Sequence, residues 1–179
     1  ARERINDTLM LQKKEMYCDS FKDGLQNWVV EQMPGGTAET VDGKLEITDV
    51  AGCTIWFNKE LEGPIMIQYD NYDSLRLYYM GVGGHDNSKT RFRRYLGNGD
   101  RPLLPEHDLS EPEYLIKPNK VIKIKIIAFN GIIQYYRDGQ CIINFYDPEP
   151  YTSGYFGFRT VNNHMTIDNF QVYGLTVAD

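Results

Sequence analysis

Residues 121–146 read VIKIKIIAFNGIIQYYRDGQCIINFY, with two turn signals separating three runs of β-branched and aromatic residues. Asn130-Gly131 joins the first two runs, and Asp138-Gly139 joins the second and third. Both dipeptides tolerate the positive φ angles that a two-residue hairpin turn requires. The segment therefore predicts three consecutive antiparallel strands.

Similar short runs, bounded by Gly, Pro, Asn and Asp, continue on both sides of this segment. Further strands are expected over residues 17–21, 28–31, 44–48, 54–57, 64–69, 74–82, 90–96, 155–159 and 165–175. Parallel α/β folds need intervening helices, and the sequence shows none between these strands. The pattern predicts an all-β protein, an antiparallel two-sheet jelly-roll sandwich.

The start of the chain differs from the rest. From Arg4 to Glu15 no Gly or Pro intervenes, and charged residues alternate loosely with Leu and Met. We expect an N-terminal arm or short helix over residues 1–16. Residues 17–179 are expected to form a single jelly-roll domain, because the length suits one core and no linker or repeat divides it.

The net charge of −6 argues against a nucleic-acid or anionic-membrane ligand, because such binding depends on basic surface. Residues 71–101 are an exception, with six basic and three acidic side chains. This local excess makes a candidate anion site, although a solvated strand edge is the plainer interpretation. No apolar run approaches the ~18 residues that a membrane helix needs, so no membrane span is expected.

The sequence offers little support for a metal site or other cofactor. The cysteines are too few and too scattered for a disulfide framework or a zinc-ligand pair. His85, His107 and His164 lie in expected loops, each without a second histidine at metal-ligand spacing. Asp19, with Asp168 and Asn169, could bind Ca²⁺ if the first and last strands pair. Hydrogen bonding at a strand end explains these residues equally well.

Strand alternation predicts a cationic and aromatic patch in the middle of the chain. Successive side chains of a strand point to opposite faces, which places Leu75, Leu77 and Tyr79 on one face of the strand over 74–82. If that face lines the core, the opposite surface holds Arg76 and Tyr78, with Arg91, Arg93 and Tyr95 from the next strand. Tyr155 and Arg159 could extend this surface. Guanidinium groups suit sugar carboxylates and tyrosine offers a flat apolar ring, although a solvated face with Arg–Asp pairs is the alternative.

Catalysis on an acidic sugar would need further groups. A uronate lyase requires a base beside cationic side chains, and the candidates are Tyr78, Tyr95, His85 and His164. A hydrolase requires two facing carboxylates. The acidic side chains of the proline-rich loop are explained more simply by solubility. They are Glu106, Asp108, Glu111 and Glu113.

Several motifs carry a resemblance to known families. Tyr135–Gly139 (YYRDG), Gly154–Arg159 (GYFGFR) and Met165–Val172 (MTIDNFQV) resemble concanavalin A-like and laminin-G-like jelly rolls. Tyr72–Tyr79 (YDSLRLYY) and Thr90–Tyr95 (TRFRRY) look more like uncharacterised secreted proteins of glycan-degrading Bacteroidetes, with a more distant similarity to YesU-type proteins. Those relatives have a longer segment before residue 71, which suggests a deletion or a missing loop at Asp70-Asn71.

The resemblance implies a secreted, periplasmic or cell-surface protein that acts on a polysaccharide or oligosaccharide. Together with the patch, it predicts a lyase or glycoside hydrolase for an acidic, uronate-containing plant or algal glycan. A non-catalytic carbohydrate-binding module is the alternative. A structural domain that buries its aromatic face in an oligomer is a hypothesis of a different class.

Overall fold

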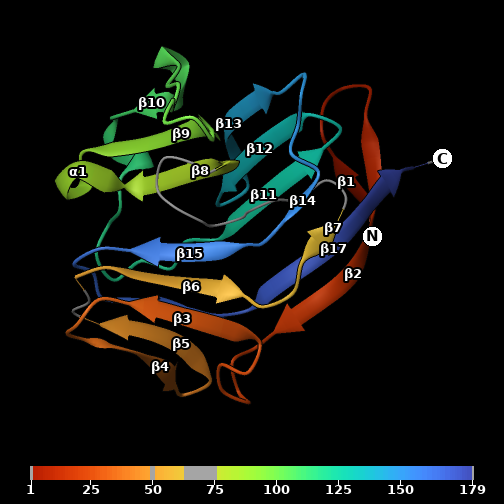
Figure 1. The fold of residues 1–179 in the computed structure, drawn as a ribbon. Coiled ribbons are helices and arrows are strands. Elements are labelled where there is room, and N and C mark those ends of the chain that lie inside the picture. The colour runs from red at the N-terminus through yellow and green to blue at the C-terminus, as the bar shows by residue number, and fades with distance from the viewer. Residues whose placement is uncertain (1, 49–50, 63–75, 179) are drawn as a thin grey trace. The chain divides into compact units, whose positions relative to one another are not determined.

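The computed structural model describes residues 2–48, 51–62 and 76–178 (Figure 1). The chain divides into two compact units. Unit 1 comprises residues 1–60 and 155–179, and unit 2 comprises residues 61–154. In both units the regular structure is almost entirely antiparallel β-sheet.

Unit 1 contains three-stranded sheets. The first has the order β1 (Arg2–Arg4), β2 (Met10–Asp19) and β17 (Phe170–Val177). The second has the order β15 (Gly157–Thr160), β6 (Cys53–Phe57) and β3 (Trp28–Gln32). The third has the order β16 (Met165–Ile167), β5 (Lys44–Thr48) and β4 (Thr37–Val41).

Aromatic rings fill much of the interior of unit 1. The Trp28 ring lies 5.3 Å from that of Phe57 and 4.8 Å from that of Phe170, measured between centroids. The Trp28 indole N–H donates a 2.9 Å hydrogen bond to the carboxylate of Asp19. The indole N–H of Trp28, the largest ring in this core, therefore has a hydrogen-bond partner at the end of β2.

The expectation of a short helix near the N-terminus is wrong. Residues 2–4 and 10–19 are strands, and β2 pairs with β17 from Asp19 back to Leu11. Leu11 is completely buried by this arrangement. Pairing with a strand at the far end of the chain outweighs the weak local helical pattern, because tertiary contacts routinely override propensity. The single domain over residues 17–179 stays a prediction.

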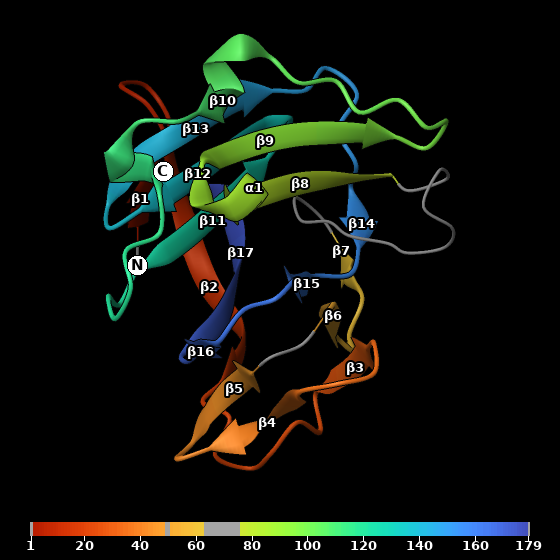
Figure 2. The ribbon, with the colours of Figure 1, turned by 90° about the vertical axis from the view of Figure 1, so that its left-hand side faces the viewer.

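Unit 2 contains residues 121–146 with their two turn signals. One of its sheets has the order β11 (Ile124–Phe129), β12 (Ile132–Arg137) and β13 (Gln140–Tyr146). Another has the order β10 (Asp108–Leu109), β9 (Lys89–Leu96) and β8 (Arg76–Gly83). β7 (Leu61–Glu62) pairs with β14 (Ser153–Gly154). A short helical turn, α1 (Gly84–Asn87), connects β8 to β9 (Figure 2), and 3-10 turns span Pro105–His107 and Pro112–Tyr114.

Both predicted hairpin turns are confirmed. Asn130 and Gly131 have φ angles of 46° and 84°, and Asp138 and Gly139 have 50° and 86°. The three strands they connect pair in sequence order. One side of this sheet supplies Ile133, Tyr135 and Ile143 to a core that also contains Phe92 of β9. The expected strand over residues 64–69 and the link at Asp70-Asn71 lie outside the described residues.

Candidate functional site

The register between β8 and β9 separates the predicted patch into two faces. Tyr78 stands opposite Arg94, and Tyr79 stands opposite Arg93. Directly opposed residues of an antiparallel pair point to the same side. The inner face holds Arg76, Tyr78, Met80, Phe92, Arg94 and Leu96, and the outer face holds Leu77, Tyr79, Gly81, Arg91, Arg93 and Tyr95.

The prediction that Arg76 and Tyr78 share a surface with Arg91, Arg93 and Tyr95 is therefore wrong. Met80 and Val82, on the same side of β8 as Tyr78, pack with it against the core residue Phe92. Both faces of β8 carry large apolar side chains, so alternation alone could not identify the face that lines the core. Leu75, which was predicted to share a face with Leu77, lies outside the described residues.

On the inner face, Tyr78 and Arg94 converge on one buried carboxylate. The Tyr78 hydroxyl and the Arg94 Nε–H each donate a 2.6 Å hydrogen bond to Oδ2 of Asp147, which is 2% exposed. The Asp147 amide donates a 2.7 Å hydrogen bond to the carbonyl of Gly131, so the hairpin turn positions this carboxylate. Burial and the bond to Asp147 raise the pKa of Tyr78. This environment keeps the hydroxyl neutral and disfavours its use as a base.

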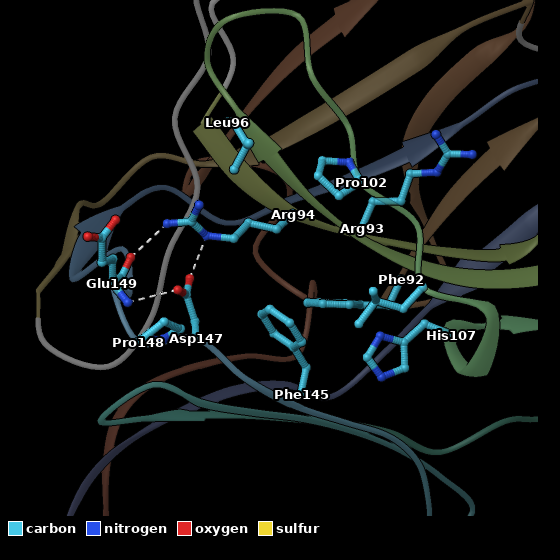
Figure 3. A pocket seen from close by; sticks show the side chains of 11 residues that line it. Phe92, Arg93, Arg94, Leu96, Pro102, His107, Phe145, Asp147, Pro148 and Glu149 are labelled. Carbon is cyan, nitrogen blue, oxygen red and sulfur yellow. Dashed lines mark hydrogen bonds and ion pairs between the residues drawn. The ribbon is translucent and has the colours of Figure 1, made fainter.

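The inner face also borders an open hollow of about 270 Å³ (Figure 3). Its lining comprises Phe92, Arg93, Arg94, Leu96, Pro102, Leu104, His107, Phe145, Asp147, Pro148 and Glu149. The His107 ring, only 6% exposed, packs edge-on against Phe92 and Phe145 with centroid distances of 5.6 and 5.8 Å. The hollow is smaller than the pockets that usually enclose drug-sized ligands, and its walls are mainly apolar.

On the outer face, the ring of Tyr79 lies against the backbone at Gly81. A Cβ atom at Gly81 would be 2.7 Å from the Tyr79 hydroxyl oxygen and 2.8 Å from its Cε1, so only glycine leaves room for the ring in this position. The Tyr79 and Tyr95 rings lie beside each other, 5.8 Å apart and inclined by 31°. Half-buried tyrosine rings thus lie along β8 and β9.

The two arginines of the outer face differ in their partners. The Nε–H of Arg91 donates a 2.9 Å hydrogen bond to Asp108, and Nη2 forms a 2.9 Å ion pair with the same carboxylate. Nη1 of Arg91 lies 2.8 Å from His85. Arg93 instead makes a long contact of 3.4 Å to the carbonyl of Arg101. Within the described part of the chain, no carboxylate lies within ion-pair distance of Arg93. In Figure 3 its guanidinium points away from that of Arg94.

The remaining predicted sugar-contact residues, Tyr155 and Arg159, belong to unit 1, as does the predicted catalytic candidate His164. Arg159 donates a 3.2 Å hydrogen bond to Thr54, and His164 lies 3.7 Å from the carboxylate of Glu46. Tyr155 precedes β15 and is half-buried. Their participation in a site with the outer face stays a prediction.

The structure also shows how the proposed calcium ligands are used. The Asp19 carboxylate accepts hydrogen bonds from the Phe21 amide, the Asn27 side chain and the Trp28 indole. Asp168 accepts a 2.7 Å bond from the Asn169 amide. Over residues 2–48, 51–62 and 76–178, no three His, Cys, Asp or Glu side chains are grouped to hold a metal ion. Hydrogen bonding at the strand ends accounts for what is seen.

Sequence reasoning missed two important features of this region. Tyr79 was expected to line the core with Leu77; Leu77 is buried, but Tyr79 packs against it half-buried, and Gly81 two residues later is the signal for the position of its ring. No local pattern identifies Asp147 as the partner of Tyr78, because 69 positions separate them. The described residues contain no helix long and apolar enough to cross a membrane.

The sheets and their connections define an all-β protein of the antiparallel jelly-roll class, as the sequence predicted. The carbohydrate binding module CBM66 from Bacillus subtilis has a similar structure, with a TM-score of 0.56 and 15% identity over 81% of this chain and 94% of that chain. A family model described as a domain of unknown function, DUF6250, matches residues 69–170. Because this match covers more than half of the chain, the protein belongs to that family. No curated protein matches the sequence.

Proposed function

We propose that the protein binds carbohydrate through the outer face of β8 and β9, and that its ligand is an acidic polysaccharide containing uronate units. The observation that carries this proposal is the position of Tyr79, held against Gly81 with Arg93 directly opposite. A ring for stacking and a guanidinium without a carboxylate partner among the described residues are thereby placed side by side.

Each group suits one part of such a ligand. The C–H face of a sugar ring packs on the apolar face of tyrosine, whose hydroxyl stays available to polar groups. The planar guanidinium of Arg93 matches a uronate carboxylate with two parallel hydrogen bonds. The name of the similar structure, a carbohydrate binding module, supports this class of ligand.

The proposal is tested by affinity electrophoresis in gels that contain polygalacturonate. We expect the wild-type protein to be retarded and Arg93→Ala to lose at least about tenfold in affinity, because a charge-assisted hydrogen bond is removed. Arg76→Ala is the matched control, because it removes the same charge from the opposite face of the same sheet. Arg93→Lys keeps the charge without the planar fork, and an intermediate affinity is expected.

A gel containing an uncharged polymer separates recognition of the acid group from general sugar binding. Retardation by polygalacturonate alone, dependent on Arg93, supports the proposal. Equal losses in Arg93→Ala and Arg76→Ala would show that only net charge matters, and the outer face would then be rejected as the site. Loss of retardation in neither variant would also reject it.

Catalysis by a lyase or hydrolase stays a prediction, and so does a location outside the cytoplasm. The geometry supports binding more directly. Tyr78 lies on the inner face, where its hydroxyl donates a hydrogen bond to Asp147, and the Nε2 atom of His85 faces Arg91. Products absorbing in the near ultraviolet, or new reducing ends, released from the same glycans would identify the protein as an enzyme.

A further inference from the structure

Beside the tyrosine rings, the outer face ends in a close contact between a histidine and an arginine. Nη1 of Arg91 lies 2.8 Å from Nε2 of His85. Arginine can only donate hydrogen bonds, so Nε2 must be the acceptor and therefore carries no proton. The contact as seen requires a neutral imidazole.

A strained turn holds His85 in this position. His85, Asp86 and Asn87 have φ angles of 52°, 55° and 57°, a left-handed conformation that non-glycine residues rarely adopt in succession. The Asn87 side chain fixes the turn through two 2.8 Å hydrogen bonds to Ile116. Its amide nitrogen donates to the Ile116 carbonyl, and its oxygen accepts from the Ile116 backbone amide. Strain of this kind persists where the surroundings enforce it, and it is concentrated at ligand-binding and switching sites.

Charged groups of β9 and β10 lie beside this contact. On β9, Arg91 pairs with Asp108 of β10, and Lys89 lies 3.8 Å from the same carboxylate. Asp86 lies within the turn itself, and the loop at Ile116 contacts the turn through its backbone. Asp108 holds one edge of the Arg91 guanidinium, which leaves the Nη1 edge to His85.

Protonation of His85 changes the hydrogen-bonding requirement at that edge. Nε2 then becomes a donor and faces another donor, Nη1 of Arg91, with like charges in contact. An anionic group placed between them would accept from both. A carboxylate or sulfate oxygen suits this position, because both donors carry positive charge.

We infer that His85 and Arg91 form a proton-linked anion site, at which an acid group of the bound glycan takes the place of their mutual hydrogen bond. This inference rests on the proposed function, because the ligand is the same acidic polysaccharide. It adds a second acid-group position to that of Arg93 and makes the affinity dependent on pH. Each ligand bound there is accompanied by uptake of up to one proton on His85.

The sign of the pH dependence follows from the charges. Histidine gains its charge between about pH 8 and pH 5, whereas carboxylates titrating near pH 4 stay ionised over that range. Lowering the pH therefore adds a positive charge beside a ligand that remains negative. We expect affinity for an oligogalacturonate to rise about threefold to fivefold from about pH 8 to about pH 5.

The experiment is isothermal titration calorimetry of the whole chain with an oligogalacturonate at both ends of that pH range. Repeating each titration in buffers of different ionisation enthalpy gives the number of protons taken up. His85→Asn is the test variant, because asparagine tolerates left-handed φ angles and does not titrate. His164→Asn is the control, because it removes an exposed histidine from unit 1 by the same substitution.

The wild-type protein and His164→Asn are expected to bind more tightly at the lower pH with proton uptake, and His85→Asn is expected to bind with neither effect. The same pH dependence in His85→Asn and wild type would overturn the inference while leaving the proposed function intact. Tight binding without proton uptake would also overturn the inference and leave the proposed function intact. Absence of binding at both pH values would overturn the inference together with the proposed function.

Discussion

The hydroxyl of Tyr78 donates a 2.6 Å hydrogen bond to the carboxylate of Asp147, across 69 positions of sequence. Arg94 donates to the same oxygen at the same distance. The two donors come from neighbouring strands, and the carboxylate follows β13. This contact links the two three-stranded sheets of unit 2, because the donors stand on one sheet and the carboxylate comes directly after the last strand of the other.

Tyr78→Phe removes one of these donors and leaves the ring in place. We expect the free energy of unfolding to fall by about 1 to 3 kcal/mol, because a buried carboxylate loses a hydrogen bond. Urea denaturation measures the change. Tyr79→Phe removes a hydroxyl from the opposite face of the same strand and should change stability by less than about 0.5 kcal/mol. A Tyr78→Phe protein as stable as wild type, or one that no longer binds glycan, would contradict this assignment.

The raised pKa of Tyr78 leads us to expect a loss of folding stability at alkaline pH. Burial, first, and the bond to Asp147 raise the pKa of Tyr78 above its ordinary value of about 10. Because the folded-state pKa is the higher one, the stabilisation is complete below about pH 10 and is lost as the pH rises toward the folded-state pKa. Burial raises the pKa of Tyr135 as well. Urea midpoints measured at rising pH should fall less steeply in Tyr78→Phe, and equal slopes would refute the prediction.

Gly81→Ala tests the arrangement of Tyr79 without removing any polar group. The added methyl would lie 2.7 Å from the Tyr79 hydroxyl oxygen and 2.8 Å from its Cε1, so the side chain must move away from the strand. We expect affinity for polygalacturonate to fall about fivefold through lost stacking. Tyr79→Phe keeps the ring and should retain most of the affinity. Unchanged binding by Gly81→Ala would show that the ring position does not matter to the ligand.

Substitutions at Asn87 separate two contributions to the stability of the left-handed turn, which are the tolerance of a positive φ and the hydrogen bonds to Ile116. Asn87→Gly keeps access to positive φ but removes both hydrogen bonds to Ile116, and Asn87→Ala loses both advantages. We expect unfolding free energies to decrease in the order wild type, Asn87→Gly, Asn87→Ala, with about 1 to 2 kcal/mol lost in Asn87→Gly. Urea denaturation gives this order. Equal stability of the two variants would mean that the φ angle costs nothing here.

Local chemistry was sufficient to predict the hairpins of unit 2. Asn130-Gly131 and Asp138-Gly139 encode their turns within two residues, and the strands on either side follow from them. The N-terminal strand β2 was not predictable in the same way, because its conformation depends on β17 at the other end of the chain. Its own residues show no alternation strong enough to identify a buried face.

The candidate site was only partly predictable for a related reason. Sequence singled out Arg91 and Arg93 and correctly placed them on one face with Tyr95. It could not decide which face of β8 lines the core, because Tyr78 and Tyr79 are equally suited to either. The partners that distinguish the arginines, Asp108 for Arg91 and Asp147 for Arg94, come from distant segments.

The indole of Trp28, enclosed by aromatic rings and tied to Asp19, has a practical consequence for experiments on this protein. The chain has two tryptophans, Trp28 and Trp56, and both belong to unit 1, whereas the sequence of unit 2 contains none. Selective excitation of tryptophan therefore follows the melting of unit 1, while circular dichroism follows both units. A difference between the two melting curves would reveal whether the halves of the chain unfold together.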